Sequence, residues 1–470
     1  MEKDIKVIFE GNEEIIKIIE SGGSIVKHLG FPNETCPLIG KKIELTKKIG
    51  KGKYGTVFDI SIPGMGTRKY VVKRGNIQLK LLEIHKNILL NIETPIGVSN
   101  AFVGSKKPTI LNTNQLEDKY GYNWNEIKQF QSENIMKTIQ KANLNDKVTV
   151  FLPSDICKLR GDQMYNKIPG KGRIIVPKGS YLCDDNSYSE FAIGAYTGRL
   201  YREGKCINFF DVYSMFTCPD PSSKNHSIYY QYIFMDKIDG ILGNHTQCIS
   251  LSKYINQIPK ESRFDIANGI YIQVICAIAI YQQELMLSHN DLHQENIFLE
   301  YVKPETQFNG QYLYDADYYS YTINNRTIYF PATPVLAKIG DYGLSVKFSE
   351  PIIGDKRIFQ DGINGNLPNI YLPQYDCLYF TAVYILIMMS DLLHGYKNEQ
   401  VILASMIFLS NLKGEVTFNM VKKTYLDNNY RPVLDKIDTV KTANDIFLGP
   451  LLNLYSKKPL SGKIVNIGNI

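Results

Sequence analysis

Residues 288–300 read SHNDLHQENIFLE, a polar string that follows a long apolar segment and leads into a short apolar one. Asp291 and Asn296 are five positions apart, so a tight loop can bring their side chains to one site. A carboxylate there can accept a proton from a hydroxyl group, and a carboxamide oxygen is a ligand for hard cations. An Asx-rich surface turn would show the same letters. His289 and His293 do not form a metal pair, because no third ligand lies near them in the loop.

A glycine-rich segment lies far upstream, where residues 50–57 read GKGKYGTV. Glycines let a backbone approach a phosphate chain closely. A dinucleotide-binding turn would need a helix directly afterwards, whereas a strand pattern follows here. On the next strand pattern Lys73 stands among apolar residues, and a buried ammonium requires an anionic partner. A solvent-facing lysine on an edge strand is the alternative.

The fourth motif is Asp341-Tyr342-Gly343, which follows the apolar run VLAKIG. It can place a carboxylate on Mg²⁺ before a sharp turn, although ordinary turns supply the same tripeptide. The four motifs occur in the order of the protein-kinase signature set. Over about residues 41–440 the sequence therefore resembles the eukaryotic-type protein kinase superfamily.

This resemblance implies an α+β, bilobal protein-kinase-like fold, with a small antiparallel-sheet N-lobe and a mostly helical C-lobe. The expected domains are an N-terminal extension over 1–40, a nucleotide-binding N-lobe over 41–240 with a large insertion at 76–180, and a helical C-lobe over 241–470 that carries the catalytic loop and activation segment.

Hydrophobic patterns predict the individual elements. Apolar runs punctuated by glycine predict strands over 41–50, 56–62 and 68–75, arranged as an antiparallel meander. The other expected elements are helices over 12–28, 78–91, 124–142, 187–204, 266–283 and 377–390, strands over 206–218 and 227–238, and a hairpin over 319–330 that turns at Asn324-Asn325.

Composition excludes several classes of protein. The chain has 470 residues, of which 44% are hydrophobic and 21% charged, so neither wholesale disorder nor a small disulfide scaffold is expected. The net charge of +6 is too small to indicate specific nucleic-acid binding. The eight cysteines form no CxxC pair, and the N-terminus lacks the apolar core of a signal peptide. We therefore expect reduced cysteines and an intracellular, cytoplasmic location, which for a viral protein means the host cytoplasm or the virion.

Two uncharged stretches and one basic stretch need separate interpretation. Residues 266–283 and 377–390 are predicted as buried helices, so no membrane association is expected. The insertion 76–180 contains 15 Lys or Arg against 9 Asp or Glu, which accounts for the whole positive excess. It is either a solvated insert or a docking surface for an acidic partner.

The resemblance implies a role for each motif. Lys73 would hold the ATP phosphates while paired to a helix glutamate, for which Glu190 is the best candidate. Asp291 would be the catalytic base, and Asn296 with Asp341 would hold Mg²⁺. The implied ATP-binding residues, among which Met235 is the gatekeeper and Phe298 the adenine floor, are Ile49, Gly50, Lys51, Gly52, Lys53, Tyr54, Gly55, Thr56, Val57, Val71, Lys73, Met235, Asp236, Ile238 and Phe298. The resemblance also implies that Asp376 anchors the backbone of the catalytic loop.

Several residues depart from the family pattern. Asn290 replaces the arginine that normally clamps a phosphorylated activation loop, so activity is expected without that phosphorylation. His293 replaces the usual lysine near the γ-phosphate, as in haspin-like kinases and aminoglycoside-type phosphotransferases. The segment from Asn296 to Asp341 is long, no Ala-Pro-Glu follows, and Arg431 lacks its customary glutamate. Divergent kinases of large DNA viruses combine such features.

The function implied is transfer of the γ-phosphoryl group of ATP to Ser or Thr hydroxyls of protein substrates, with Mg²⁺ as cofactor. A small-molecule phosphotransferase of the aminoglycoside type is the first alternative, which His293 and the missing Ala-Pro-Glu favour. A catalytically weak pseudokinase scaffold is the second, although Lys73, Asp291, Asn296 and Asp341 are all present.

Overall fold

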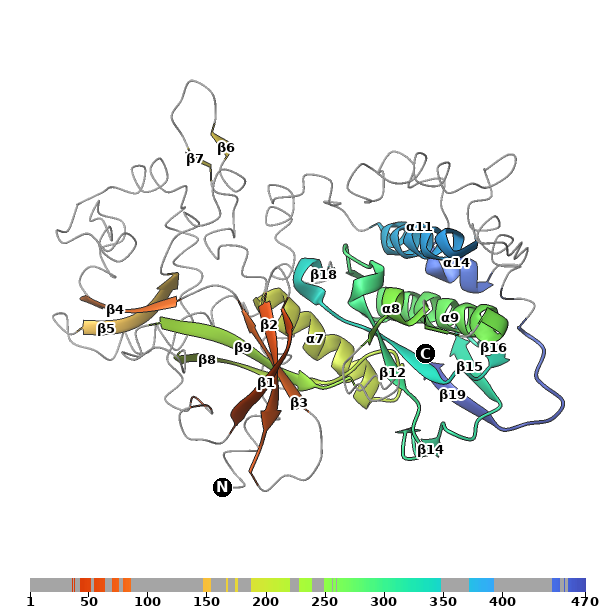
Figure 1. Ribbon diagram of the computed structural model, residues 1–470. Coiled ribbons are helices and arrows are strands. Elements are labelled where there is room, and N and C mark those ends of the chain that lie inside the picture. Colours follow the sequence, from red (N-terminus) through yellow and green to blue (C-terminus); the bar gives the residue numbers. More distant parts are fainter. Residues whose placement is uncertain are drawn as a thin grey trace. The chain divides into compact units, whose positions relative to one another are not determined.

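The computed structural model describes residues 36, 38, 43–51, 55–63, 70–75, 79–85, 147–153, 166–167, 174–175, 187–219, 228–238, 249–255, 257–258, 260–347, 372–392, 442–448, 452 and 455–470 (Figure 1). The helices predicted over 12–28 and 124–142, the loop residues Gly52, Lys53 and Tyr54, and Arg431 lie outside these ranges. The chain divides into two compact units. The first comprises Met1–Ala192, Val212–Asp236 and Glu350–Asn369, and the second comprises Ile193–Asp211, Lys237–Ser349 and Ile370–Ile470. The lobe boundaries expected from the sequence stay predictions.

The first unit is built on a seven-stranded antiparallel sheet. In spatial order its path is β1 (Glu44–Lys51), β2 (Gly55–Ser61), β3 (Tyr70–Gly75), β9 (Ile228–Asp236), β4 (Leu79–His85) and β5 (Lys147–Pro153), while β8 (Val212–Pro219) also pairs with β9. The meander predicted for the first three strands is confirmed. The short strands β6 (Asn166–Lys167) and β7 (Ile174–Ile175) form a separate pair.

The prediction of a helix over 78–91 is wrong, because residues 79–85 form strand β4. Strand β5 pairs with β4 along its whole length, from Leu79 opposite Pro153 to His85 opposite Lys147. The partner sequence KVTVFLP is rich in β-branched and aromatic residues, which favour a pleated surface. Pairing with a distant strand has thus overridden the local helical pattern.

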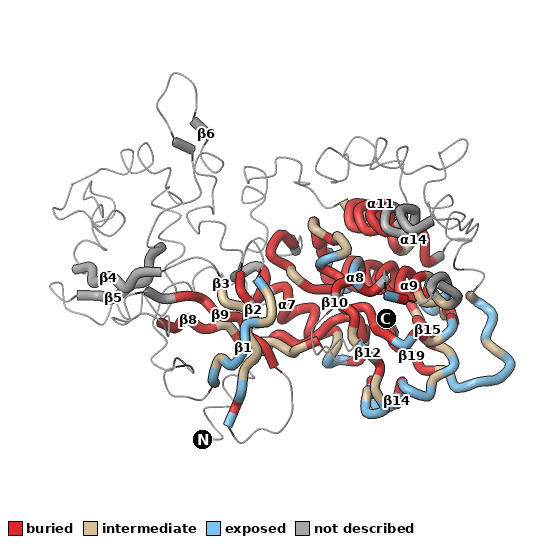
Figure 2. The backbone as a smooth tube through the Cα atoms, viewed as in Figure 1, coloured by how far each residue is buried: buried red, intermediate tan, exposed pale blue. Residues whose placement is uncertain are grey.

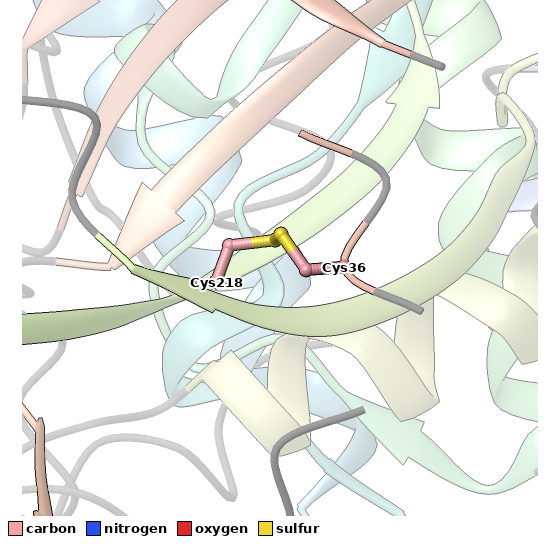
Figure 3. Close-up of a disulfide and its surroundings, with 2 residues drawn as sticks. All are labelled: Cys36 and Cys218. Atoms are coloured by element: carbon pink, nitrogen blue, oxygen red, sulfur yellow. A yellow bond between two sulfur atoms is a disulfide. The ribbon is translucent and has the colours of Figure 1, made fainter. Parts of the chain in front are cut away.

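One disulfide joins the N-terminal segment to the sheet: Cys36 is bonded to Cys218 on β8 (Figure 3). Both cysteines belong to a buried apolar cluster that includes Val72, Tyr232 and Phe234. The sequence predicted reduced cysteines, and the structure differs at this pair. The two residues are 182 positions apart, and only the fold brings their Cα atoms to 5.4 Å.

The second unit combines helices with small sheets. Its helices are the C-terminal part of α7 (Ser187–Arg202), α8 (Leu251–Ile255), α9 (Lys260–Leu285), α11 (Pro373–Leu392) and α14 (Ala443–Leu448), with 3-10 turns η4 (Gln294–Asn296) and η5 (Tyr342–Leu344). Its strands are β10 (Ile249–Ser250), β11 (Leu287–Ser288), β12 (Ile297–Tyr301), β13 (Gln307–Phe308), β14 (Gln311–Tyr312), β15 (Tyr318–Ile323), β16 (Arg326–Pro331), β17 (Val335–Ile339), β18 (Val346–Lys347) and β19 (Ile464–Asn469).

Two three-stranded sheets organise the second unit. One has the order β10-β12-β17, and the other has the order β16-β15-β19, in which the C-terminal strand β19 runs parallel to β15. The hairpin predicted at Asn324-Asn325 is confirmed, since both residues have the positive φ (52° and 61°) that a two-residue turn requires.

The predicted strands over 206–218 and 227–238 correspond to β8 and β9, and β8 begins later than expected, at Val212.

The central helix of the second unit is α9. Residues Ile270–Gln282 are all buried, which Figure 2 shows as a continuous red segment. Asp265–Leu285 is long and apolar enough to cross a membrane, yet 83% of its most apolar window is buried inside the protein. On α11 every residue over 375–384 is buried as well. Both stretches are therefore core helices, as the sequence predicted.

Breaking the Cys36–Cys218 bridge is expected to destabilise the first unit. The bridge removes freedom from the unfolded chain, and its loss should lower the free energy of unfolding by about 2–4 kcal/mol. Adding a reductant should therefore lower the urea midpoint of the wild type and leave that of Cys218→Ser unchanged. A non-reducing digest without a linked Cys36–Cys218 peptide would contradict the bridge.

Candidate active site

Lys73 lies in the interior of the sheet. Strand β3 is paired on both sides, so that Lys73 stands opposite Val57 of β2 and Ile233 of β9. A solvent-facing lysine on an edge strand is therefore excluded. Its Nζ donates to both carboxylate oxygens of Glu190, at 2.6 and 2.7 Å.

The ion pair is largely shielded from water, because the two side chains are only 13% and 10% exposed. Glu190 lies in the first turn of α7, where the helix dipole favours a negative charge. Lys73 thus pairs with Glu190, the glutamate expected from the resemblance, while Glu203, directly after α7, contacts Arg199 and Lys205. Because both charges are mostly buried, removing either one would leave the other buried without its ion-pair partner, which is unfavourable.

The two strands that flank the glycine loop, β1 and β2, pair with each other. Gly50 pairs with Val57, and Lys51 pairs with the buried Thr56. A Cβ at Gly55 would lie 2.8 Å from the Arg74 carbonyl oxygen and 3.1 Å from Cε of Lys73. Glycine is thus required at position 55 for the Lys73 stem to pack against β2.

Residues expected at the adenine lie on several elements. Val71 pairs with Met235 at the end of β9, and Asp236 accepts a hydrogen bond from the Tyr213 hydroxyl at 2.7 Å. Ile238 follows this strand and is buried. Phe298 lies on β12 in the second unit, half-buried, and a Cβ at Gly340 would approach its ring to 2.8 Å.

Asp376 fixes the backbone at the start of the candidate catalytic loop, which contains Asp291 and Asn296. Its carboxylate accepts the amide N–H groups of His289 and Asn290 at 2.7 and 2.8 Å, and the Tyr281 hydroxyl at 2.8 Å. The carboxyl is completely buried, and this burial raises its pKa, while the three donors and His289 act in the opposite direction. The anchor expected from the resemblance is therefore present.

The candidate catalytic loop is closed by hydrogen bonds of Asn296. The Nδ2 of Asn296 donates to the backbone oxygen of Asp291 at 2.8 Å and lies 3.5 Å from its Oδ2. Both contacts use the amide nitrogen, so Oδ1 is the atom of Asn296 suited to a cation. His293 caps η4: its Nδ1 accepts from the Glu295 amide at 3.1 Å, so a neutral imidazole carries its proton on Nε2, 3.6 Å from the Asp291 carboxylate.

Asp341 is placed next to this loop by strand pairing. Ile297 of β12 stands opposite Ile339 of β17, and the Gly340 amide donates to the Asn296 carbonyl at 3.1 Å. Asp341 adopts a left-handed conformation with φ of 60°, a strained state for a non-glycine residue that is common at functional sites. The pairing brings Asn296 and Asp341 to the same end of two adjacent strands.

The side-chain oxygen atoms of Asn296 and Asp341 are a donor set that fits Mg²⁺. One carboxylate and one amide oxygen suit this ion, which keeps waters and phosphate oxygens as its other ligands. Within the described ranges, no group of three or more His, Cys, Asp or Glu residues is arranged to hold a metal without such additional ligands.

Neutral contacts hold the residues that follow Asp341, where the resemblance implies the start of an activation segment. Asn290, at the position of the usual arginine, donates through Nδ2 to the Leu344 carbonyl at 3.1 Å. The Ser345 hydroxyl donates to the His289 carbonyl at 3.2 Å, and Ser345 is completely buried. Leu287 and Ser288 of β11 pair with β18 immediately after. These contacts need no phosphate group.

Sequence reasoning missed Lys338, a buried lysine three residues before Asp341. Its Nζ donates to the carbonyls of Ile207 and Phe209 at 2.6 and 3.0 Å and contacts Glu300 at 3.2 Å. The signal was present, since a lysine inside the apolar run VLAKI requires partners just as Lys73 does.

The structure therefore holds two groups of predicted residues. Lys73, Glu190 and the strands of the glycine loop belong to the first unit, and Asp291, His293, Asn296 and Asp341 belong to the second. Their catalytic and ligand-binding roles stay predictions.

No protein-family model matches the chain. Among curated proteins, "Uncharacterized protein 098R" of Invertebrate iridescent virus 6 is 31% identical over 136 residues, which is 29% of this chain and 20% of that protein. "Putative serine/threonine-protein kinase R301" of Acanthamoeba polyphaga mimivirus is 26% identical over 209 residues, which is 42% of this chain and 49% of that protein. The chain thus spans less than half the length of either relative. The second similarity supports a kinase-like chain with mixed α/β structure.

Replacing Gly55 by alanine is expected to cost stability, whereas replacing Gly50 is not. The new Cβ at position 55 would press on the Arg74 carbonyl and the Lys73 stem, and such overpacking costs about 1–3 kcal/mol. At Gly50 the nearest atom would be Cβ of Val57 at 3.8 Å, an ordinary contact. Urea unfolding of Gly55→Ala and Gly50→Ala measures the difference, and equal midpoints would show that Lys73 does not pack there.

Proposed function

We propose that this chain is an ATP- and Mg²⁺-dependent protein kinase that phosphorylates Ser or Thr hydroxyls of protein substrates. The observation that carries the proposal is the shielded Lys73–Glu190 ion pair in the interior of the sheet. A lysine held in this way presents a fixed positive charge for phosphate oxygens. The Asp291, Asn296 and Asp341 cluster supplies the remaining groups that phosphoryl transfer needs.

In this proposal each residue has a defined task. The backbone between β1 and β2 covers the phosphates, and Lys73 binds the α- and β-phosphate oxygens. Asn296 Oδ1 and Asp341 would hold Mg²⁺, which neutralises charge on the phosphates when bound. Asp291 orients the acceptor hydroxyl and accepts its proton. Because the transition state is loose, this positioning and charge compensation provide most of the catalysis.

His293 bears on the choice of acceptor. Its Nδ1 is occupied by the Glu295 amide, so its Nε2–H group can donate one hydrogen bond near the Asp291 carboxylate. It lacks the fixed charge of the usual lysine. This difference favours a small-molecule alcohol as the alternative acceptor, and the test below therefore includes both classes.

Two further assignments belong to the same proposal. We place the enzyme inside the cell, in keeping with its proposed use of ATP; because Cys36 and Cys218 form a disulfide, this placement does not rest on reduced cysteines. We assign the basic insertion 76–180 to docking of an acidic partner, on the basis of its charge excess.

Replacing Asp291 by asparagine is expected to reduce phosphoryl transfer by about 10³-fold and to leave ATP affinity within about twofold, because the proton acceptor is lost while the nucleotide contacts remain. Radiolabelled ATP is offered with a basic protein and, separately, with a panel of small alcohols. The matched control is Asp265→Asn, an exposed carboxylate on α9 that should retain full activity.

Transfer to the protein acceptor that disappears in Asp291→Asn supports the proposal. Transfer to alcohols alone would replace it with the small-molecule alternative. Nucleotide binding without transfer in the wild type would identify a pseudokinase.

Phosphatase treatment is expected to leave activity unchanged. The start of the activation segment is tied by Asn290 and Ser345 to backbone carbonyls, so no phosphate is needed to order it. The measurement is kcat before and after complete dephosphorylation, verified by intact mass. A tenfold loss that rephosphorylation restores would show that a phosphorylated residue controls the enzyme.

A further inference from the structure

The pairing of β1, β2 and β3 assigns their side chains to the two faces of the sheet. Residues that stand opposite each other in an antiparallel pair lie on the same face, and neighbours along a strand alternate between faces. Thr56 stands opposite Arg74, and Phe58 stands opposite Val72, which belongs to the buried apolar cluster. Arg74 therefore lies on the face that carries this cluster, and Lys73 lies on the other face.

Arg74 packs against two aromatic rings on this face. Its Cζ is 4.4 Å from the ring centroid of Tyr230 and 5.4 Å from that of Phe58. A planar guanidinium group is stabilised by contact with aromatic ring faces, and such contact restricts its orientation. The side chain is only partly exposed. The two rings therefore hold the guanidinium group of Arg74 in a defined plane.

The guanidinium group has no anionic partner among the described residues. Its Nε is buried without a hydrogen-bond acceptor, and no described carboxylate forms an ion pair with it. A buried donor that lacks an acceptor is unfavourable and calls for an explanation. The planar N–H groups of arginine match the two oxygens of a carboxylate. Arg74 thus presents an oriented group for which this structure supplies no acceptor.

Two lysines of β1 extend the positive charge on the same face. Lys48 stands opposite Phe58, and Lys51 stands opposite Thr56. Both lysines are exposed, and Figure 2 shows β1 mostly in pale blue and tan. No carboxylate of the described residues pairs with either of them. Lys48, Lys51 and Arg74 together define a cation face on these three strands.

The carboxylates of these strands lie elsewhere. Glu44 stands opposite Ser61, and Asp59 follows Phe58, so both belong to the face opposite the cation face. On β9, Asp236 does share the cation face, but it lies at the C-terminal end of the strand and accepts a hydrogen bond from the Tyr213 hydroxyl at 2.7 Å. The charges on β1, β2 and β3 are therefore segregated, with only cations on one face.

Apolar side chains beside these cations indicate the kind of partner. Leu45, Phe58 and Ile60 pack against the apolar cluster and are still partly exposed. A peptide that carries both carboxylates and apolar side chains can use the cations and this apolar surface together. A nucleic acid instead requires a longer series of cations, because its binding depends on contacts with many phosphates.

We propose that the cation face is a docking surface for an acidic, partly apolar peptide segment of a partner protein. Arg74 binds one carboxylate in the plane of its guanidinium group, and Lys48 and Lys51 attract further carboxylates. Lys73 lies on the opposite face of the sheet, so docking requires no change in the Lys73–Glu190 ion pair. The proposed docking adds a partner to the chain and does not depend on phosphoryl transfer.

The test measures fluorescence anisotropy of a labelled eight-residue peptide, made of alternating glutamate and leucine, titrated with the full chain. We expect saturable binding to the wild type and none of the same peptide with glutamine in place of glutamate. Arg74→Gln should weaken binding at least about tenfold, because a charge-assisted hydrogen bond is lost. Arg74→Lys should also weaken it, because lysine lacks the planar set of donors. Unchanged affinity in Arg74→Gln would overturn the proposal.

A matched pair of lysine variants separates the cation face from general charge attraction. Lys47 and Lys48 are adjacent and both exposed, but Lys47 stands opposite Asp59 and so belongs to the other face. Lys48→Gln should weaken binding about threefold, whereas Lys47→Gln should leave it unchanged. Both variants remove one positive charge, so any attraction by the basic insertion 76–180 changes equally in the two. Equal weakening would contradict docking at this face.

The remaining outcomes also decide the proposal. Absence of saturable binding to the wild type at about millimolar peptide would overturn it. Tighter binding of an eight-nucleotide single-stranded DNA that is lost in Arg74→Gln would assign the face to nucleic acid instead. The urea midpoint of each variant verifies folding, and if Arg74→Gln does not fold, the lysine pair decides. None of these measurements involves ATP, so their failure leaves the proposed function untouched.

Discussion

The candidate catalytic loop depends on one buried carboxylate. Asp376 accepts two consecutive backbone amides, from His289 and Asn290, and so fixes the chain directly before Asp291. A carboxylate with no solvent contact is costly unless donors surround it, and here the Tyr281 hydroxyl provides a third. The apolar helices α9 and α11 contribute Tyr281 and Asp376, so both core helices take part in fixing this loop.

The two ends of helix α7 have different contacts. Its first turn gives Glu190 to a sheet lysine, and its last turn leads into a loop whose backbone is bonded to β17 and β19. Of these two strands, β19 is the C-terminal strand and β17 is one of those that lie between Asn296 and Asp341 in sequence. The long segment between Asn296 and Asp341 therefore contains a strand, β17, that forms hydrogen bonds with the buried loop after α7.

At Asn290, where the sequence departs from the kinase pattern, neutral hydrogen bonds to backbone carbonyls are formed. Where the family has an arginine that awaits a phosphate, Asn290 bonds a backbone carbonyl directly. Ser345, one of the few hydroxyl groups near this segment, is buried and donates to the His289 carbonyl. These hydrogen bonds are neutral and form on folding, whereas an arginine–phosphate contact requires a modification.

The sequence by itself determined features set by neighbouring residues: the β1–β3 meander, the turn at Asn324-Asn325 and the buried character of α9. The pairing of Lys73 with Glu190, which joins residues 117 positions apart, is a prediction of the family resemblance. Only the tertiary structure decided that residues 79–85 form a strand, that Cys36 meets Cys218, and that Asn208 and Lys338 satisfy a buried loop. Each of these depends on partners far along the chain. Local patterns record the preferences of a segment, whereas pairing and the satisfaction of buried polar groups depend on what the fold places beside it.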